Sequence, residues 1–180
     1  MQVLKLTNSG MPVAWTSLEN AAALICKGIV NWELGHAVQL RGGHNHFGQR
    51  SVIDIPAIIA VDGARQSRRT TPLLTNRALF KRDHCRCLYC GEVFSHRELT
   101  RDHVFPRSRG GLDTWNNVVT SCSRCNHQKD CRTPEEAGMP LLAIPYTPNP
   151  FEIAYLQGRK VLQDQEDYLK QQFGQFRLAA

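Results

Sequence analysis

Two Cys-x2-Cys pairs, with a few polar residues between and after them, are the part of this 180-residue chain best suited to chemistry. The pairs are Cys87/Cys90 and Cys122/Cys125. One tight Cys-x2-Cys turn supplies two thiolates, and two such turns complete the tetrahedron that zinc prefers. We therefore predict a structural Zn²⁺ site made of these four cysteines, in preference to ordinary buried thiols.

The chain has seven cysteines, and three of them stand outside this pattern. Cys85 is a rival ligand because it is close to Cys87, but it lacks a partner at the Cys-x2-Cys distance. Cys26 and Cys131 are interpreted as core or incidental thiols. An odd cysteine count without a signal-peptide pattern favours a reducing compartment, so we expect a cytoplasmic protein. No stretch approaches the roughly 18 apolar residues of a membrane helix, so no membrane association is expected.

A second group of polar residues, Asp102-His103, Asn117 and Asn126, suggests phosphodiester hydrolysis. That reaction needs a base to activate water, a cation to stabilise the phosphate, and a group to orient the base. His103 is the predicted base because imidazoles titrate near neutral pH. Asp102 is a hard oxygen ligand for Mg²⁺ or Mn²⁺, and Asn126 can add a carbonyl oxygen to the same ion. Asn117 can hold the imidazole or the loop through its amide.

The local geometry adds two conditions to this site. Neighbouring residues on a strand point to opposite faces, so Asp102 and His103 can meet only where the strand ends. The Phe105-Pro106 sequence that follows indicates such an end. His127 is an alternative metal ligand to Asn126, although one residue of helix turns the side chain by about 100°.

A basic block surrounds these residues. Between Arg65 and Arg132 there are 14 Lys and Arg against 6 Asp and Glu, whereas the rest of the chain is slightly acidic. Such an uneven distribution within a net charge of +6 is typical of a phosphate-binding surface. The block is therefore predicted to contact nucleic acid.

Short elements must position the site. We expect a basic helix over Arg77–Arg82, strands over Leu99–Val104 and Val118–Thr120, and a helix that begins near Ser123. A glycine-rich loop over Pro106–Thr114 separates the strands, and Gly110-Gly111 allows it to turn sharply. The order strand, loop, strand and helix places Asn126 on the element that directly follows the second cysteine pair.

The flanking sequence predicts a small α+β region before the site and a helical tail after it. Expected strands are Val3–Leu6, Pro12–Trp15, Ala37–Leu40 and Ser51–Ile55, with a helix from Ser17 through Lys27 and a brief apolar run at Ile58–Val61. Residues 140–150 are interpreted as a proline-rich linker, and Phe151–Phe173 as a helical tail. The expected division is therefore 1–74, 75–139 and 140–180.

The segments RDHVFPRSRGG and CSRCNHQK, with Asn117 between them, resemble the HNH endonuclease family, the ββα-metal nucleases, in its four-cysteine zinc form. The chain is similar in particular to short stand-alone bacterial members. The resemblance implies an α+β fold with a zinc-stabilised ββα-metal finger and one catalytic divalent ion. It also implies products with 5′-phosphate and 3′-hydroxyl ends.

Matched to the family's motif, His103 is the general base, Asn117 the middle Asn, and Asp102 the metal-ligating Asp. The third motif position falls on Asn126, so this chain has H-N-N, similar to the HNH domains of RNA-guided nucleases. By the same pattern the basic positions Arg107, Arg109 and Lys129 are expected to contact phosphates. His44-Asn45-His46 spells the family letters, but without the Asp and the cysteines we interpret it as a polar hairpin tip.

Two functions follow from these residues. The first is a metal-dependent DNA endonuclease, and the second is a non-catalytic, zinc-stabilised nucleic-acid-binding module. The Asp102-His103 pair favours the first, because a pure binder has no need of it. A redox role for the Cys-x2-Cys pairs would leave that pair unexplained. Since one active site cuts one strand at a time, duplex cleavage would suggest a homodimer or two sequential events. The N-terminal region is expected to provide target choice or dimerisation.

Overall fold

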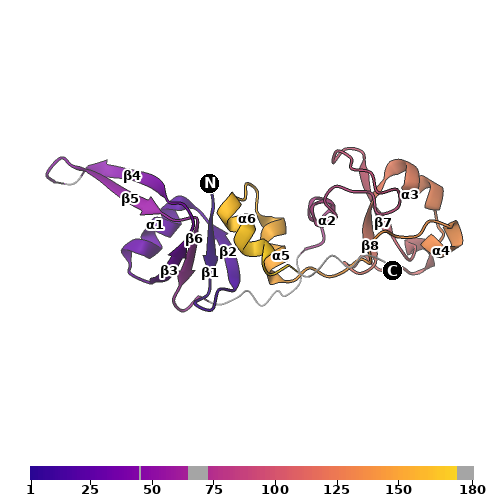
Figure 1. The fold of residues 1–180 in the computed structure, drawn as a ribbon, viewed down its shortest axis with the longest axis horizontal. Coiled ribbons are helices and arrows are strands. Elements are labelled where there is room, and N and C mark those ends of the chain that lie inside the picture. Colours follow the sequence, from indigo (N-terminus) through magenta and orange to yellow (C-terminus); the bar gives the residue numbers. More distant parts are fainter. Residues whose placement is uncertain (45, 65–72, 174–180) are drawn as a thin grey trace. The chain divides into compact units, whose positions relative to one another are not determined.

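The structure is a computed structural model that describes residues 1–44, 46–64 and 73–173. The chain forms two compact units, one from Met1–Thr70 with Pro150–Phe173 and the other from Thr71–Asn149 (Figure 1). The predicted C-terminal tail is therefore not a separate part, because its helices pack with the N-terminal region. In chain order, the second unit, which contains Cys87, Cys90, Cys122 and Cys125, is inserted into the first.

The first unit is built on a four-stranded sheet. Its strands are β1 (Val3–Leu6), β2 (Pro12–Thr16), β3 (Val30–Leu34) and β6 (Ile58–Val61), in the order β2-β1-β6-β3. The β1 and β6 strands are parallel and the other two pairings are antiparallel. Strand β3 was not predicted from the sequence. It lies at the sheet edge, where only one neighbour and a partly exposed surface leave a weak apolar signal.

Helices cover both faces of this sheet (Figure 1). Helix α1 (Leu18–Cys26) begins after the N-cap Ser17 and packs on the face that carries Val3 and Ile59. Helices α5 (Pro150–Gln157) and α6 (Gln163–Lys170) pack on the face that carries Leu4 and Ile58. The alternation of these residues between the two clusters follows from the two-residue period of a strand.

The β4–β5 hairpin continues this unit beyond the sheet. Strand β4 (Val38–His44) pairs with β5 (Arg50–Ile55), and both strands are longer than predicted. Residues 41–44 and Arg50, which lie between the two predicted strands, are therefore strand. Of the predicted hairpin tip His44-Asn45-His46, His44 is the last residue of β4 and His46 lies in a turn, while Asn45 lies outside the described residues.

The second unit contains the predicted ββα arrangement. Strands β7 (Leu99–His103) and β8 (Val118–Cys122) form an antiparallel hairpin, and α3 (Ser123–Lys129) follows β8 without a loop. Helix α2 (Asn76–Arg82) precedes it, and the short helices η1 (Arg107–Arg109) and α4 (Pro134–Ala137) complete it. The α+β class and the ββα finger are thereby confirmed.

Arg82 is a buried residue that connects several segments of this unit. The residue is only 4% exposed. Its guanidinium forms an ion pair of 2.7 Å with Asp83 and donates to the carbonyls of Trp115, Val118 and Tyr146. Asp83 in turn accepts from the backbone N–H of Thr120 on β8 at 2.8 Å. Part of the basic block is therefore structural and not available to phosphates.

The expected linker is packed against the second unit over most of its length. Ala143 is buried, and the backbone N–H of Leu142 donates to the carbonyl of Leu88. Thr147 donates to the side chain of Asn116, and Tyr146 accepts from Arg82. Prolines predict an extended segment, but they do not indicate whether its side chains pack against the rest of the unit. None of the helices in the described ranges is long and apolar enough to cross a membrane.

Candidate active site and metal centre

The four predicted cysteines form one cluster. The Sγ atoms of Cys87, Cys90, Cys122 and Cys125 all lie within 4.8 Å of one another. The first pair sits in a tight turn closed by Gly91, which has a φ of +79° and donates its N–H to the carbonyl of Cys87. The second pair spans the junction of β8 and α3. Four convergent thiols are a donor set that suits zinc.

The electrostatics of the cluster also fit a divalent cation. Burial raises the pKa of the Cys87 thiol, but backbone N–H groups of Cys90, Cys122 and Tyr89 outweigh it and lower the pKa to about 7. Burial, followed by the neighbouring thiols Cys122 and Cys87, raises the pKa of Cys125. Several thiolates can coexist here only if a cation offsets their mutual repulsion. Cys85 lies outside the cluster, with its sulfur 3.5 Å from Nε2 of His96.

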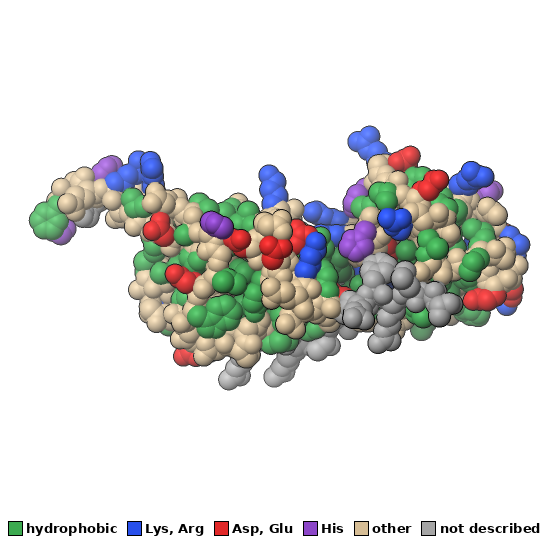
Figure 2. All heavy atoms as spheres, in the orientation of Figure 1, with side chains coloured by type: hydrophobic (Ala, Val, Ile, Leu, Met, Phe, Trp, Pro, Cys, Tyr) green, Lys and Arg blue, Asp and Glu red, His purple; other side chains and the backbone are tan. Residues whose placement is uncertain are grey.

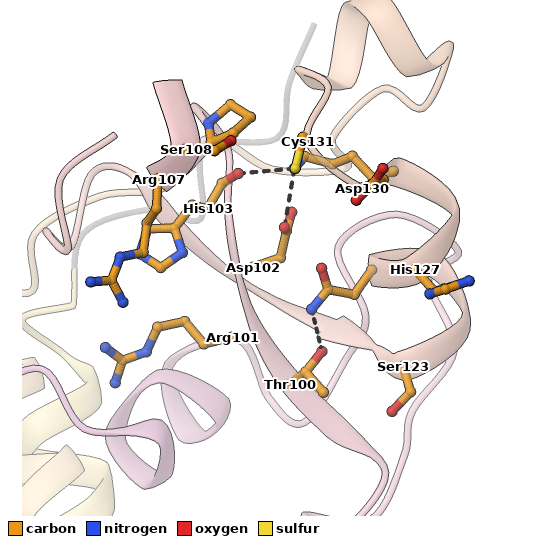
Figure 3. A pocket seen from close by; sticks show the side chains of 13 residues that line it. Thr100, Arg101, Asp102, His103, Arg107, Ser108, Ser123, His127, Asp130 and Cys131 are labelled. Carbon is orange, nitrogen blue, oxygen red and sulfur yellow. Dashed lines mark hydrogen bonds and ion pairs between the residues drawn. The ribbon is translucent and has the colours of Figure 1, made fainter. Parts of the chain in front are cut away.

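Strand β7 presents two different faces to its surroundings. Thr100 and Asp102 meet residues of α3, because Thr100 contacts Asn126 and Asp102 contacts Lys129. Arg101 and His103 are on the other face. His103 is the last residue of the strand, and a cavity of about 490 Å³ at this end is lined by both Asp102 and His103. Both residues therefore line one cavity, although their side chains leave opposite faces of β7 (Figure 3).

Asp102 is buried and hydrogen-bonded through both oxygens. Oδ1 accepts from Nζ of Lys129 at 3.0 Å, and Oδ2 accepts from the hydroxyl of Tyr89 at 2.5 Å. Tyr89 was not identified from the sequence, although its position between Cys87 and Cys90 placed it in the metal-binding turn. Burial, followed by the hydrogen bond to Asp102, raises the pKa of the Tyr89 hydroxyl, which therefore remains a donor. The cysteine turn thus directly orients the predicted ligand of the catalytic ion.

His103 has a partner that sequence reasoning missed. Its Nε2 lies 3.0 Å from Oδ1 of Asp113, a residue of the loop between β7 and β8. Asp113 also accepts two hydrogen bonds from Nη1 of Arg101, at 2.8 and 2.6 Å. Arg101 precedes His103 by two residues, so both side chains lie on one face of β7. That spacing, with an acid in the following loop, was the available signal.

The charge of Asp113 is stable. Hydrogen bonds from Arg101 lower the pKa of its carboxyl below the ordinary value of 3.8, and His103 adds a smaller effect in the same direction. A lowered pKa means that the ionised form, and the contacts that depend on it, persist as pH falls until the lowered value is reached. Because a carboxylate only accepts hydrogen bonds, His103 donates from Nε2.

Asn117 holds the loop and not the imidazole. Its side-chain oxygen accepts from the backbone N–H of Phe105, and its amide donates to the carbonyls of Phe105 and Leu112. The loop closes tightly here, since a Cβ on Gly111 would lie 1.8 Å from the carbonyl oxygen of Phe105. Of the two roles expected for Asn117, the structure shows contacts that suit the second.

Asn126 and His127 occupy different positions on α3. The amide nitrogen of Asn126 donates to Oγ1 of Thr100 at 2.9 Å, and both residues line the cavity. His127 is exposed, and Figure 3 shows its ring pointing away from Asp102 and His103. The register of α3 therefore favours Asn126 over His127 as the partner of Asp102.

The three predicted phosphate contacts differ in their surroundings. Arg107 lines the cavity. Arg109 forms an ion pair of 2.6 Å with Glu136 and lies over the ring of Phe105. Lys129 is 1% exposed and donates to Asp102 and to the carbonyl of His103 at 2.9 Å. The motif pattern predicted a phosphate contact for Lys129, whereas in the structure it is buried and pairs with Asp102.

The residues around the cavity fit a hydrated divalent cation. Mg²⁺ in proteins is bound by one or two carboxylates, with waters and substrate phosphates completing its shell. Asp102 and Asn126 supply one carboxylate and one amide oxygen at the same cavity. No cluster of three His, Cys, Asp or Glu ligands occurs in this cavity among the described residues. This sparse donor set suits an ion that shares its ligands with the substrate.

Comparison with known proteins supports this interpretation. A family model described as HNH endonuclease matches residues 87–142. The CRISPR-associated endonuclease Cas9 of Corynebacterium diphtheriae is 38% identical over 50 residues, which make up 27% of this chain and 5% of that protein. This chain therefore corresponds to only a small part of that relative.

The match spans the four cysteines, both strands of the ββα hairpin and helix α3. It thus falls on the elements that gather Asp102, His103 and Asn126 around one cavity. Through this segment, residues 87–142, the chain matches the HNH endonuclease family model.

Proposed function

We propose that this protein is a metal-dependent DNA endonuclease that hydrolyses phosphodiester bonds, with His103 as the general base. The observation that carries the proposal is the meeting of Asp102, His103 and Asn126 at one cavity, with Asp113 holding the imidazole. Surrounding arginines, including Arg107 in the cavity wall, supply the positive charge that a phosphate backbone requires.

The hydrogen bonds of His103 suggest which nitrogen reacts. Nε2 donates its proton to Asp113, so Nδ1 is the nitrogen that carries a lone pair and can accept a proton from water. The water oxygen then forms a bond to phosphorus while the bond from phosphorus to the 3′ oxygen breaks. The departing 3′ oxygen takes up a proton from solvent water, which leaves a 3′-hydroxyl and a 5′-phosphate.

A divalent ion, Mg²⁺ or Mn²⁺, would be held by Asp102 and Asn126 and would stabilise the negative charge on the phosphate and the leaving oxygen. Tyr89 and Lys129 fix the orientation of Asp102 through their hydrogen bonds. The four cysteines would hold Zn²⁺, which in this role maintains the fold and does not react.

One observation favours the non-catalytic binding module as a second candidate. Lys129 already provides Asp102 with a positive partner at 3.0 Å, so this carboxylate has a satisfied position without a second ion. A module of that kind would bind DNA without cutting it under any divalent ion.

A plasmid-nicking assay separates the two candidates. We expect the purified protein to nick DNA with Mg²⁺ or Mn²⁺, and His103→Ala to lose at least about 100-fold in rate while DNA binding persists, as for removal of a general base. His127→Ala is the matched control, because it removes an exposed imidazole from the same cavity wall. Binding without nicking by the unmodified protein across all divalent ions would overturn the nuclease proposal.

Two further expectations belong to the proposal. A reducing, cytoplasmic location belongs to the proposal, because four of the cysteines converge as a metal-binding set of thiols. A single HNH site cuts one strand at a time, so cutting both strands needs a second copy or two successive events. Light scattering combined with a comparison of nicked and linear plasmid products distinguishes these two routes.

A further inference from the structure

The β4–β5 hairpin has a held base and an exposed outer half. Leu40, Ile53 and Ile55 pack against the core beneath helix α1. Beyond this base, every described residue from Arg41 to Val52 is exposed. Figure 1 shows the two strands extending from the sheet of their unit as an arm, which we call the ribbon and define as residues 41–52. The ribbon does not pack against the core of this unit.

The register of the two strands gathers the basic side chains of the ribbon on one face. Leu40 pairs with Ile53 and faces the core, so the next pair, Arg41 with Val52, faces the opposite way. A Cβ built on Gly42 would lie 3.4 Å from that of Ser51, which places these two residues together on the face of Leu40.

The register of β4 shifts between Arg41 and His44, which is a β-bulge. Beyond the bulge His44 pairs with Arg50, and this pair again lies on the face of Arg41. Arg41, His44 and Arg50 therefore share one solvent-exposed face.

The charge of this face is uncompensated in the described structure. The segment from Arg41 to Arg50 contains no Asp or Glu. Within the described ranges, no carboxylate forms an ion pair with Arg41 or Arg50. Basic and histidine side chains gather on the arm in Figure 2, and an apolar side chain lies at its end. Phe47, in the turn, is 75% exposed.

We propose that the ribbon is a second DNA-binding element, in which Arg41 and Arg50 contact the phosphates of duplex DNA. The inference rests on the proposed nuclease function, because that function supplies the polyanionic partner. The major groove of B-DNA is wide enough for a two-stranded ribbon. Gly42 and Gly43 have no side chains, so the basic strand is thin at this point. The space beside Gly43 is open, because a Cβ there would meet nothing within 4 Å.

The binding test uses the full chain with His103→Ala, so that the duplex stays intact. Anisotropy of a labelled duplex is followed between about 50 and 200 mM salt, where phosphate contacts have their largest effect. For Arg41→Gln/Arg50→Gln we expect binding about tenfold weaker and a salt slope smaller by about 2, as for two lost phosphate contacts. The matched control is Arg159→Gln/Lys160→Gln, the same charge change on exposed residues of the same unit.

A second pair of variants tests the sign of the effect. Gly43→Glu adds a carboxylate in open space, whereas Gly43→Gln adds a side chain of the same size without charge. We expect Gly43→Glu to weaken binding and Gly43→Gln to leave it within about twofold of the starting value, because phosphate repels only the charge.

Several results would overturn the inference. Equal affinities for the Arg41/Arg50 and Arg159/Lys160 variants would remove the ribbon from the DNA interface. A change of oligomeric state with unchanged DNA affinity would show that the ribbon contacts a second copy of the chain. The proposed function fails separately, through absent nicking by the unmodified protein, and in that case the binding series still decides the role of the ribbon.

Discussion

Asp113 is the residue whose position matters most for the proposed chemistry. It accepts hydrogen bonds from both Arg101 and His103, and this arrangement fixes the tautomer of the imidazole. A carboxylate that orients a base acts through that base and does not touch the substrate. It is therefore a positioning residue, and its removal should affect turnover more than substrate binding.

We expect Asp113→Asn to lower kcat for nicking by about 100-fold with little change in KM, because the Asn amide can donate to Nε2 and so favour the wrong tautomer. Initial rates over a range of plasmid concentrations measure both quantities. Asp113→Glu keeps the carboxylate and should recover part of the rate. A rise in KM with unchanged kcat would contradict the positioning role.

Tyr89 links the cysteine turn to Asp102. Its hydroxyl is the donor to Oδ2, so Tyr89→Phe leaves the orientation of Asp102 to its hydrogen bond with Lys129 alone. We expect the Mg²⁺ or Mn²⁺ concentration for half-maximal nicking to rise about tenfold, the usual effect of losing a partner of a metal ligand. Tyr155→Phe, in the other unit, is the control for loss of a phenol. An unchanged metal requirement in Tyr89→Phe would show that this hydrogen bond is not used.

At the scale of elements, the second unit is joined by buried polar contacts as well as by apolar ones. Arg82 connects α2 with β8 and with the proline-rich linker. Its guanidinium carbon lies 5.5 Å from the ring centroids of both Trp115 and Tyr146. If the Arg82 guanidinium is removed, the carboxylate of Asp83 is left buried in the interior without its cationic partner.

We therefore expect Arg82→Met to destabilise the second unit by about 3–5 kcal/mol, the range for breaking a buried ion pair. Amide hydrogen exchange resolves the two units, and protection should fall in β7 and β8 but not in β1 and β6. Arg159→Met, at an exposed position, should change neither region. Equal loss of protection in both units would instead indicate that they unfold as one.

At the scale of the whole molecule, the two units depend on different sources of stability. The first unit has two apolar clusters on either side of its sheet, and it is closed by Gln165, which donates to the carbonyls of Gln2 and Ala57. The second unit has short elements around the four cysteines. Zinc bound at such a site contributes on the order of 10 kcal/mol to folding.

Removal of zinc should consequently unfold one unit and spare the other. After a strong chelator has extracted the metal, we expect loss of amide protection across 73–149 and retention of it in β1, β6 and α1. Zinc analysis of the dialysed protein confirms that the extraction succeeded. Retained protection of β7 and β8 in verified zinc-free protein would contradict a folding role for the metal.

The sequence alone was sufficient for the cysteine cluster and for most elements of both units. Cys-x2-Cys spacing constrains the thiols through covalent geometry, and Ser17, Thr75 and Thr133 each cap a helix that starts next to them. Strands near β7 and β8, on either side of a glycine-rich loop, were expected from the sequence, and their pairing was implied by the family resemblance. These are local relationships, and local residues determine them.

Only the tertiary structure decided what surrounds His103 and Asp102 and how the chain divides. Asp113, Tyr89 and Lys129 reach these two residues from other elements, and Arg82 and Lys129 are interior despite their charge. The helices after Pro150 pack on strands near the start of the chain. Each of these facts depends on contacts between distant segments, because burial and partner choice are properties of the packed chain and not of its local sequence.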